Sequence, residues 1–293
     1  MSSDRKFVVF ILTHGRPRDI KTIKSLQNSG YTGDWKLIVD DEDSTIDEYR
    51  QEWGDDRIIM FSKSGIEKEQ NIDLMDQGGV RATITFARNA CWPIAKTLGV
   101  THFVQLDDDY TSFLYRWMMD DQKAGHQKAL GWTIRSLDRV FQAYLDLLDA
   151  TGAASVAMSQ GGDFIGGLGC GSRGFQLKRK AMNSFFCRTD RPVNFIGRMN
   201  EDVNTYVTES LRGKLFFSHT ATQLCQGRTQ SSEGGITELY RDAGTYVKSM
   251  YTVIAAPGCT SIERMGSKDR RIHHRIEWNS AAPKIVGEDC RRI

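Results

Sequence analysis

Residues 101–115, THFVQLDDDYTSFLY, decide the fold of this chain. The run THFVQL is typical of a buried strand, and three carboxylates, Asp107, Asp108 and Asp109, stand at its carboxyl end before a second apolar run begins. Adjacent carboxylates repel one another, and the burial of an unpaired charge is costly. The cluster therefore needs solvent, basic partners or a metal ion, so this strand end indicates a ligand site as well as a fold.

The chain before this stretch alternates between strand and helix patterns. Continuous apolar runs indicate buried strands at residues 6–14, 35–40 and 57–62. Helical periodicity follows each of them, at residues 19–30, 45–53 and 82–99. Pro93 is expected to start, kink or split the third of these helices. This order indicates an α/β fold with a doubly wound, mostly parallel sheet, in which residues 101–106 form the fourth strand.

The second half of the chain has a more irregular, mixed pattern. Helices are expected at residues 134–148, 200–213 and 236–254. Strands are expected at residues 154–159 and 215–219. There is no internal repeat and no linker rich in Pro, Gly or Ser, so we expect one domain over residues 1–293.

The composition is that of a globular protein of 293 residues, with 40% apolar and 26% charged residues. Six cysteines stand singly, so neither a disulfide framework nor a structural zinc site is expected. No apolar run approaches the ~20 residues of a membrane span. The N-terminus MSSDRKFVVF carries charge where a signal peptide needs an apolar segment. We therefore expect a cytoplasmic protein.

The net charge of +2 hides a strong asymmetry along the chain. Residues 40–56 contain nine acidic residues and one arginine. Basic residues predominate instead in residues 173–191 and 264–275. Runs of this kind are often only solvated surface, but two of them flanking a candidate site favour a polyanionic partner.

The acidic strand end suits a divalent cation. Side chains alternate along an extended strand, so Asp107 and Asp109 are expected on one side and Asp108 on the other. A D-x-D pair offers hard oxygen ligands to Mg²⁺ or Mn²⁺, and a solvated acidic turn is the alternative. Residues 13–17 and 40–43 follow two other predicted strands. Because the carboxyl ends of parallel strands face a common crevice, these three loops together would suit a nucleotide.

A second acidic group, Glu201 and Asp202, follows Asn200 at the start of a predicted helix. Acids at this place complement the helix dipole without any further function. Their order after the D-x-D group also suits an acceptor site in which one of the two carboxylates acts as general base. His219, at the end of the following strand, is a candidate third metal ligand, with a purely structural role as the alternative.

Over about its first 220 residues the chain resembles nucleotide-sugar glycosyltransferases of the GT-A type. The resemblance lies in the order of five features: ILTHGRP, LIVDDED, TFARNACWPIAKTLGVTHFVQLDDD, NED and the downstream histidine. The chain is also similar to the phage TET-associated glycosyltransferases, particularly in the segments SSEGGITELYRDAGTYVKSMYTVIAAP and RIHHRIEWNSAAPKIV. This second resemblance covers nearly the whole chain. That family is implied in sugar transfer to 5-hydroxymethylcytosine in DNA. The chain has D-D-D where many relatives have a neutral middle residue, which leaves the ligating pair open.

The resemblance implies roles for individual residues. Contacts to the nucleotide-sugar would come from Thr13, Arg16, Asp40 or Asp41, Arg88, Asn89 and Asp108, and contacts to the donor diphosphate or a DNA phosphate from His273 and His274. The metal would be held by Asp107, Asp109 and His219. The catalytic base would be Asp202 or Glu201. Candidates for DNA backbone contacts are Arg173, Lys178, Arg179, Lys180, Arg264, Lys268, Arg270, Arg271 and Arg275.

The implied reaction moves a hexose from UDP-glucose or UDP-N-acetylglucosamine to the hydroxymethyl group of 5-hydroxymethylcytosine in double-stranded DNA, with Mn²⁺ or Mg²⁺. Within the single GT-A-like domain we expect a nucleotide-binding half (1–110), an acceptor and catalytic half (111–262) and a basic tail (263–293). A phage-encoded protein of this kind would act in the host cytoplasm.

Three other functions stay open from the sequence. The first is a GT-A enzyme that acts on protein or glycan hydroxyls. The second is a sugar-1-phosphate nucleotidyltransferase, which would normally have a G-x-G-T/S-R-like loop where this chain has THGRPRD. The third is a DNA-binding module without catalytic activity.

Overall fold

The structure is a computed structural model that describes residues 5–70, 72, 83–121, 126–164, 174–182, 184–227, 237–265 and 271–290. Its strands are β1 (Phe7–Leu12), β2 (Trp35–Asp40), β3 (Ile58–Phe61), β4 (His102–Asp107), β5 (Tyr110–Asp121), β6 (His126–Thr133), β7 (Ser155–Ser159), β8 (Phe175–Gln176), β9 (Ser184–Arg188), β10 (Phe216–Gln226), β11 (Thr260–Met265) and β12 (Arg271–Ile276). Its α-helices are α1 (Lys21–Asn28), α2 (Ile46–Trp53), α3 (Lys63–Glu69), α4 (Thr85–Thr97), α5 (Leu137–Thr151), α6 (Glu201–Leu211), α7 (Thr237–Ala255) and α8 (Trp278–Ala281). Short 3-10 turns are η1 (Asp55–Arg57), η2 (Gly161–Phe164) and η3 (Glu288–Cys290).

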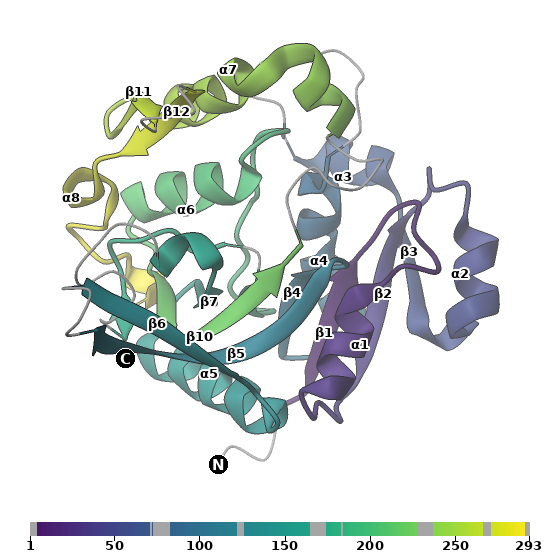
Figure 1. The fold of residues 1–293 in the computed structure, drawn as a ribbon. Coiled ribbons are helices and arrows are strands. Elements are labelled where there is room, and N and C mark those ends of the chain that lie inside the picture. Colours follow the sequence, from purple (N-terminus) through teal and green to yellow (C-terminus); the bar gives the residue numbers. More distant parts are fainter. Residues whose placement is uncertain are drawn as a thin grey trace.

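One large sheet runs through the molecule in the order β3-β2-β1-β4-β9-β7-β10-β5-β6, with β8 paired to β10 (Figure 1). The pairs β2–β3, β1–β2, β1–β4 and β7–β10 are parallel. The pairs that involve β9, β5 or β8 are antiparallel. Apart from β9, β5 and β8, the strands of this large sheet therefore run in one direction. The predicted α/β fold with a mostly parallel sheet is confirmed.

Alternate residues of β1 face two separate cores. Phe10 and Leu12 pack in a cluster with residues of α4 and α6, whereas Val9 and Ile11 pack in a second cluster with residues of α1 and α5. Helices therefore cover both faces of the sheet (Figure 1), which is why β1 is apolar at every position. Side chains on the α4 face of the sheet have different neighbours from side chains on the α5 face. The face to which a side chain points therefore decides whether it can contribute to the functional site described below.

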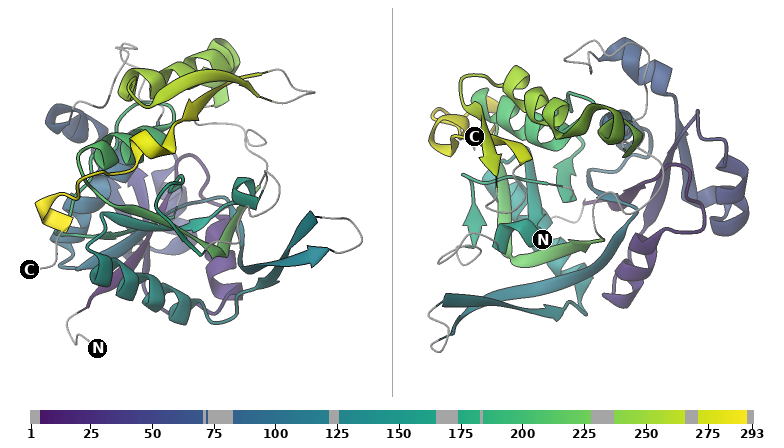
Figure 2. Two further views of the ribbon diagram at one scale, coloured as in Figure 1. Left: turned by 90° about the vertical axis from the view of Figure 1, so that its left-hand side faces the viewer. Right: turned by 45° about the horizontal axis from the view of Figure 1, so that its top comes forward.

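Two features differ from the sequence-based expectation. Strands β5 and β6 form a hairpin that we did not predict, and it projects from the body of the protein (Figure 2). Its outer part leaves Trp117 and Trp132 exposed, so the strands lack the usual alternation of buried apolar and exposed polar residues. Helix α4 continues through Pro93, which neither starts nor splits it.

The C-terminal part forms a further layer. Helix α7 and the β11–β12 hairpin lie over α6 (Figures 1 and 2). The boundary that we expected between residues 262 and 263 falls inside β11, where Ile262 pairs with His274 of β12. The expected basic tail is therefore partly a strand of this layer. In the part of the chain that the structure describes, no helix is long and apolar enough to span a membrane.

Candidate functional site

Each of the three aspartates at the end of β4 has its own set of side-chain partners. Asp108 accepts hydrogen bonds from Thr13 Oγ1 at 2.8 Å and from Arg16 Nη1 at 3.1 Å. Both partners come from the loop after β1, which is the parallel neighbour of β4. Asp109 instead accepts from Gln226 Nε2, at 3.1 Å to Oδ1 and 3.0 Å to Oδ2. The structure thus brings together Thr13, Arg16 and Asp108, as the sequence predicts.

Arg88 of α4 joins the two acidic groups. Its Nη2 donates to Asp107 Oδ1 at 3.0 Å, and its Nε donates to Glu201 Oε1 at 3.1 Å. The guanidinium is fully buried, with its carbon atom 5.3 Å from the ring centre of Phe185 and 5.7 Å from that of Phe195. Contacts with aromatic ring faces and ion pairs with two carboxylates offset the desolvation cost of burying an arginine. Arg88 therefore couples the end of β4 to the start of α6.

We expect Arg88→Ala to lower the free energy of unfolding by about 3 kcal/mol, because the change leaves two carboxylates without their buried cation. Part of the loss is relieved if one carboxylate takes up a proton. Urea unfolding at neutral pH measures the effect, and Arg18→Ala, at a side chain that is 74% exposed, is the matched control. An Arg88→Ala protein as stable as the wild type would show that this bridge contributes nothing to folding.

Asp107 and the second acidic group open into one cavity of about 470 Å³ on the α4 side of the sheet. Arg88, Asp107, Glu201 and Asp202 contribute to its lining. The remaining lining residues are Ile84, Gln160, Lys180, Met182, Asn200, Val203, Tyr206, Gln226, Lys248, His273, His274, Ile276 and Trp278. The fold thus brings Asp107 to the same cavity as Glu201 and Asp202, whereas Asp108, Asp109, Thr13 and Arg16 are not among its lining residues.

Two carboxylates in this cavity, those of Asp107 and Asp202, ionise less readily than usual. Burial raises the pKa of Asp107 to about 7, with Asp109, Glu201 and Asp108 adding to the effect and Arg88 opposing it. Burial and the neighbouring charge of Glu201 raise the pKa of Asp202 to about 6. Arg88 alone therefore does not offset the burial and the surplus of like charges at these two carboxylates.

This surplus of negative charge fits a divalent cation at Asp107 and Asp109, since their oxygens are hard ligands that Mg²⁺ and Mn²⁺ prefer. Among the described residues, however, no three His, Cys, Asp or Glu side chains come together as a metal site. A cation here would take its other ligands from the nucleotide or from water.

His219 does not belong to this cavity, contrary to the expectation that it is a metal ligand. Its ring stacks on Phe175 with 4.3 Å between ring centres and meets the edge of Tyr144 at 6.0 Å. It lines a different cavity of about 360 Å³ beside α5. His219 points to this face of β10 because its neighbour two residues earlier, Phe217, packs against the α5-side core.

The loop after β2 also differs in detail from the expectation. Both carboxylate oxygens of Asp40 are already engaged, Oδ2 by His14 Nδ1 at 2.7 Å and Oδ1 by Lys63 Nζ at 2.9 Å. Asp41 is exposed, and its Oδ1 accepts from the backbone N–H of Lys63 at 3.0 Å. Sequence reasoning missed His14 and Lys63, although His14 directly follows Thr13 at the strand end. Asp40 therefore anchors His14 and Lys63, and its Oδ1 also accepts from the backbone N–H of Glu42 at 3.1 Å.

Asn89 is likewise a structural residue. Its side-chain amide donates to Phe195 O at 2.9 Å and its Oδ1 accepts from Phe195 N at 2.8 Å. Both hydrogen-bonding groups of the side chain are thereby paired with the segment that leads into α6. The predicted contact of Asn89 with the nucleotide is wrong, whereas Arg88 does line the cavity.

Asn200 connects the start of α6 to the C-terminal layer. It adopts a left-handed backbone conformation with φ 54°, which asparagine tolerates better than most residues. Its Nδ2 donates to Lys248 O at 2.8 Å, and it lies 3.2 Å from Thr252 Oγ1 and from His274 Nδ1. This link sets α7 and β12 against the acidic start of α6.

His273 and His274 both line the same cavity, as an anion-binding role requires. Burial lowers the pKa of His274 to about 3, and the positive charges of His273, Lys248 and Lys180 add to the effect. His273 Nδ1 donates to His274 O at 2.7 Å. Sequence reasoning missed Lys248 and Gln226, because nothing in their local patterns marks them as site residues.

The predicted DNA-contacting residues lie in several different environments. Arg179 is paired with Asp163 at 2.9 Å, and Lys178 donates to Asn279 Oδ1 at 2.7 Å. Lys180 lines the cavity. Arg264 and Arg275 are on the β11–β12 hairpin, where Arg264 is exposed and Arg275 pairs with Glu263 across the two strands. Arg173, Lys268 and Arg270 lie outside the described residues, as does the side chain of Arg271.

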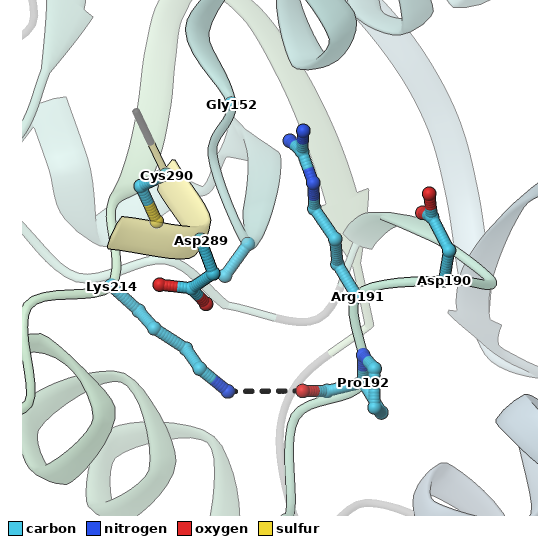
Figure 3. A pocket seen from close by; sticks show the side chains of 8 residues that line it. Gly152, Asp190, Arg191, Pro192, Lys214, Asp289 and Cys290 are labelled. Carbon is cyan, nitrogen blue, oxygen red and sulfur yellow. Dashed lines mark hydrogen bonds between the residues drawn. The ribbon is translucent and has the colours of Figure 1, made fainter. Parts of the chain in front are cut away.

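A smaller cavity of about 240 Å³ lies where η3 meets the body of the protein (Figure 3). Lys214 crosses it and donates to Pro192 O at 3.0 Å, and its ammonium also pairs with Glu209 at 2.7 Å. None of the predicted site residues lines this cavity. We interpret it as a packing gap beneath the C-terminal segment.

The chain is similar to several solved structures at low sequence identity. Among solved structures, residues 1–349 of TarS from S. aureus are similar at 12% identity and a TM-score of 0.41, over 77% of this chain and 61% of that one. Glucosyl-3-phosphoglycerate synthase from Mycobacterium tuberculosis, in complex with Mn²⁺ and UDP-glucose, is similar at 10% identity and a TM-score of 0.47, over 94% of this chain and 90% of that one. This chain thus spans less than two thirds of the TarS fragment. No curated protein matches.

The family model that matches is that of the TET-associated glycosyltransferases, and the match extends over residues 7–235. It includes the loop after β1, the aspartates of β4 and the acidic start of α6. It ends before α7, so Lys248, His273 and His274 lie beyond it. Most of the two segments in which the sequence resembles this family, residues 231–257 and 271–286, also lie beyond the match. The family itself is confirmed: the chain belongs to the TET-associated glycosyltransferase family.

Proposed function

We propose that the chain transfers a hexose from a UDP-sugar to the hydroxymethyl group of 5-hydroxymethylcytosine in double-stranded DNA, with Mn²⁺ or Mg²⁺ as cofactor. The observation that carries this proposal is the single cavity in which Asp107 at the end of β4 and Asp202 at the start of α6 both lie, with Arg88 between them. One acidic group suits an activated, metal-bound donor, and the other suits a hydroxyl acceptor.

The donor belongs at the carboxyl ends of β1 and β4, next to the cavity that Asp107 lines. Thr13, Arg16 and Asp108 form one hydrogen-bonded group at these strand ends, which is where nucleotides bind in open α/β sheets. Asp107 and Asp109 would hold the cation. When bound, the cation neutralises the charge that develops on the UDP leaving group as the glycosidic bond breaks.

We assign the general base to Asp202 and give Glu201 a positioning role. Glu201 accepts a charge-assisted hydrogen bond from Arg88, so its carboxylate is engaged in holding the guanidinium that also contacts Asp107. Asp202 accepts from the backbone N–H of Val203 at 2.7 Å and has a pKa raised to about 6. A base with a pKa close to neutrality removes the proton of a hydroxyl group more effectively.

A definite pH dependence follows from this assignment. Asp202 acts as base only when ionised, so kcat/KM is expected to fall by about tenfold for each pH unit below about 6 and to level off above it. Rates should be measured at saturating metal, because protons also compete with the cation at Asp107, whose pKa is about 7. A flat profile between pH 5 and 8 would contradict the assignment.

The acceptor base must leave the DNA helix to enter this cavity. Extrusion of a nucleotide costs a few kcal/mol, which contacts with the DNA backbone can offset. The basic side chains at the cavity and on the β11–β12 hairpin are candidates for these contacts. The family name supports a role in DNA modification, and the cavity volume suits a single nucleotide with the transferred sugar.

The decisive experiment offers the purified protein a panel of UDP-sugars with two duplexes that differ only in one 5-hydroxymethylcytosine. Mass spectrometry of the digested nucleosides should show one added hexose on the modified duplex alone, and only with Mn²⁺ or Mg²⁺. Transfer to both duplexes, or only to protein or glycan hydroxyls, would refute the acceptor assignment.

A further inference from the structure

We propose that Lys180, Lys248 and His274 form a phosphate subsite on the acceptor side of the cavity, which binds the phosphodiester next to the target nucleotide. The inference rests on the proposed function and deepens it, because it states which part of the acceptor the enzyme binds. Two of the three residues lie beyond the part of the chain that matches the family model.

The lining of the cavity contains side chains of opposite charge. It includes the carboxylates of β4 and α6, and it also includes a basic group made of Lys180, Lys248 and the two histidines of β12. The two lysine side chains are half-buried, and Lys180 Nζ lies 3.9 Å from Asp163 Oδ1. Lysines that reach a cavity shielded from solvent attract an anion more strongly than lysines at an open surface.

Asn200 contacts the ring of His274. The amide nitrogen of Asn200 is identified by its contact with the carbonyl of Lys248, and an amide nitrogen can only donate. This nitrogen has two hydrogens and also lies 3.2 Å from Thr252 Oγ1 and from His274 Nδ1. When its second hydrogen is donated to His274 Nδ1, the neutral ring carries its proton on Nε2. Since the ring lines the cavity, the Nε2–H group is the one that it can offer to a ligand oxygen.

The basic group lies near the proposed base. Asn200, which holds the backbone of Lys248, directly precedes Glu201 and Asp202 in the chain. Lys248 also acts on Asp202, lowering the pKa that burial and Glu201 raise. A ligand that contacts Lys248 is therefore next to the base that receives the acceptor's proton.

The chemistry of the acceptor agrees with this placement. In a pyrimidine nucleotide with the base in the anti orientation, the C5–C6 edge faces the nucleotide's own 5′-phosphate. A 5-hydroxymethyl group within reach of Asp202 thus brings a phosphodiester to the same end of the cavity. The same oxyanion chemistry would also suit the donor diphosphate, so the test must separate the two sources.

Binding of a fluorescent trinucleotide with a central 5-hydroxymethylcytidine provides this test. One version has ordinary phosphodiester linkages, and the other has an uncharged methylphosphonate on the 5′ side of the central residue. The wild type should bind the charged version about 10- to 100-fold more tightly, as expected for a charge-assisted contact. Lys248→Ala and Lys180→Ala should each lower this ratio by about tenfold. Lys284→Ala, at an exposed lysine outside the cavity, should leave the ratio unchanged.

Equal binding of both trinucleotides by the wild type would overturn the subsite. So would an unchanged ratio in both lysine variants accompanied by a higher KM for the UDP-sugar, because the cations would then bind the donor. Failure of the proposed function has a different signature. In that case the phosphate preference is retained, but cytosine and 5-hydroxymethylcytosine are bound equally and neither receives sugar.

Discussion

Replacing Asp107 and Asp109 together by asparagine is expected to reduce kcat about 1000-fold or more, while the protein stays folded. The two asparagines keep the shape of the side chains but remove the charge that would hold the cation against the leaving group. The loss of one preorganised electrostatic contact in an active site typically costs about 10²- to 10³-fold, and here two are removed. Initial rates with a UDP-sugar and hydroxymethylated duplex measure the effect.

The structure also predicts the effect of the double variant on stability. Asp107 is buried among like charges, which raise its pKa, so removing two of these charges relieves repulsion. The same change removes one carboxylate partner of Arg88, which opposes this relief. The melting temperature without metal is therefore expected to stay close to that of the wild type. Calorimetric titration should show that Mn²⁺ binding is lost. Asp55→Asn, at a side chain that is 85% exposed, is the matched control and should change neither quantity. Normal turnover by the double variant would refute the metal site.

Asp202→Asn is expected to lower kcat about 10²- to 10⁴-fold with little change in the KM of the donor, because an amide cannot accept the proton of the attacking hydroxyl group. Glu201→Gln should have a smaller effect that is shared between kcat and KM. Its side chain holds Arg88, which positions Asp107, and it is not assigned a proton-transfer role. Single-turnover measurements with both variants separate chemistry from binding.

The pH profile gives the second criterion for Asp202. The acid limb near pH 6 should disappear in Asp202→Asn and remain in Glu201→Gln, because only the first change removes the titrating base. If Glu201→Gln loses the limb and the larger share of the rate, the roles of the two carboxylates must be exchanged.

Much of the site was predictable because it lies at the ends of strongly patterned strands. The apolar runs before Thr13 and Asp107 are unambiguous, and parallel pairing of neighbouring strands necessarily brings their carboxyl ends together. The start of α6 was predictable for a similar reason, since its acids follow Asn200 and precede a helical pattern that ends at Gly213. Local sequence patterns were sufficient in these places.

The failures share a different cause. His219 was assigned to the metal by its order in the chain, but a strand sends alternate side chains to opposite faces, and the register of β10 directs this ring toward α5. Asn89 follows Arg88 directly and yet pairs with the backbone of Phe195. Adjacent residues on a helix point in different directions, so the role of one says little about the other.

By itself, the sequence determined the α/β class, the strand ends that carry Asp107 and Asp108, and the acidic start of α6. These depend on hydrophobic periodicity and on short-range turn and helix signals. The tertiary structure alone decided that Arg88 bridges Asp107 and Glu201, that Asp40 is occupied by His14 and Lys63, and that α7 and β12 bring Lys248 and His274 to the cavity. Such contacts join residues far apart in the chain. Their formation depends on which faces pack together, and no local pattern encodes that choice.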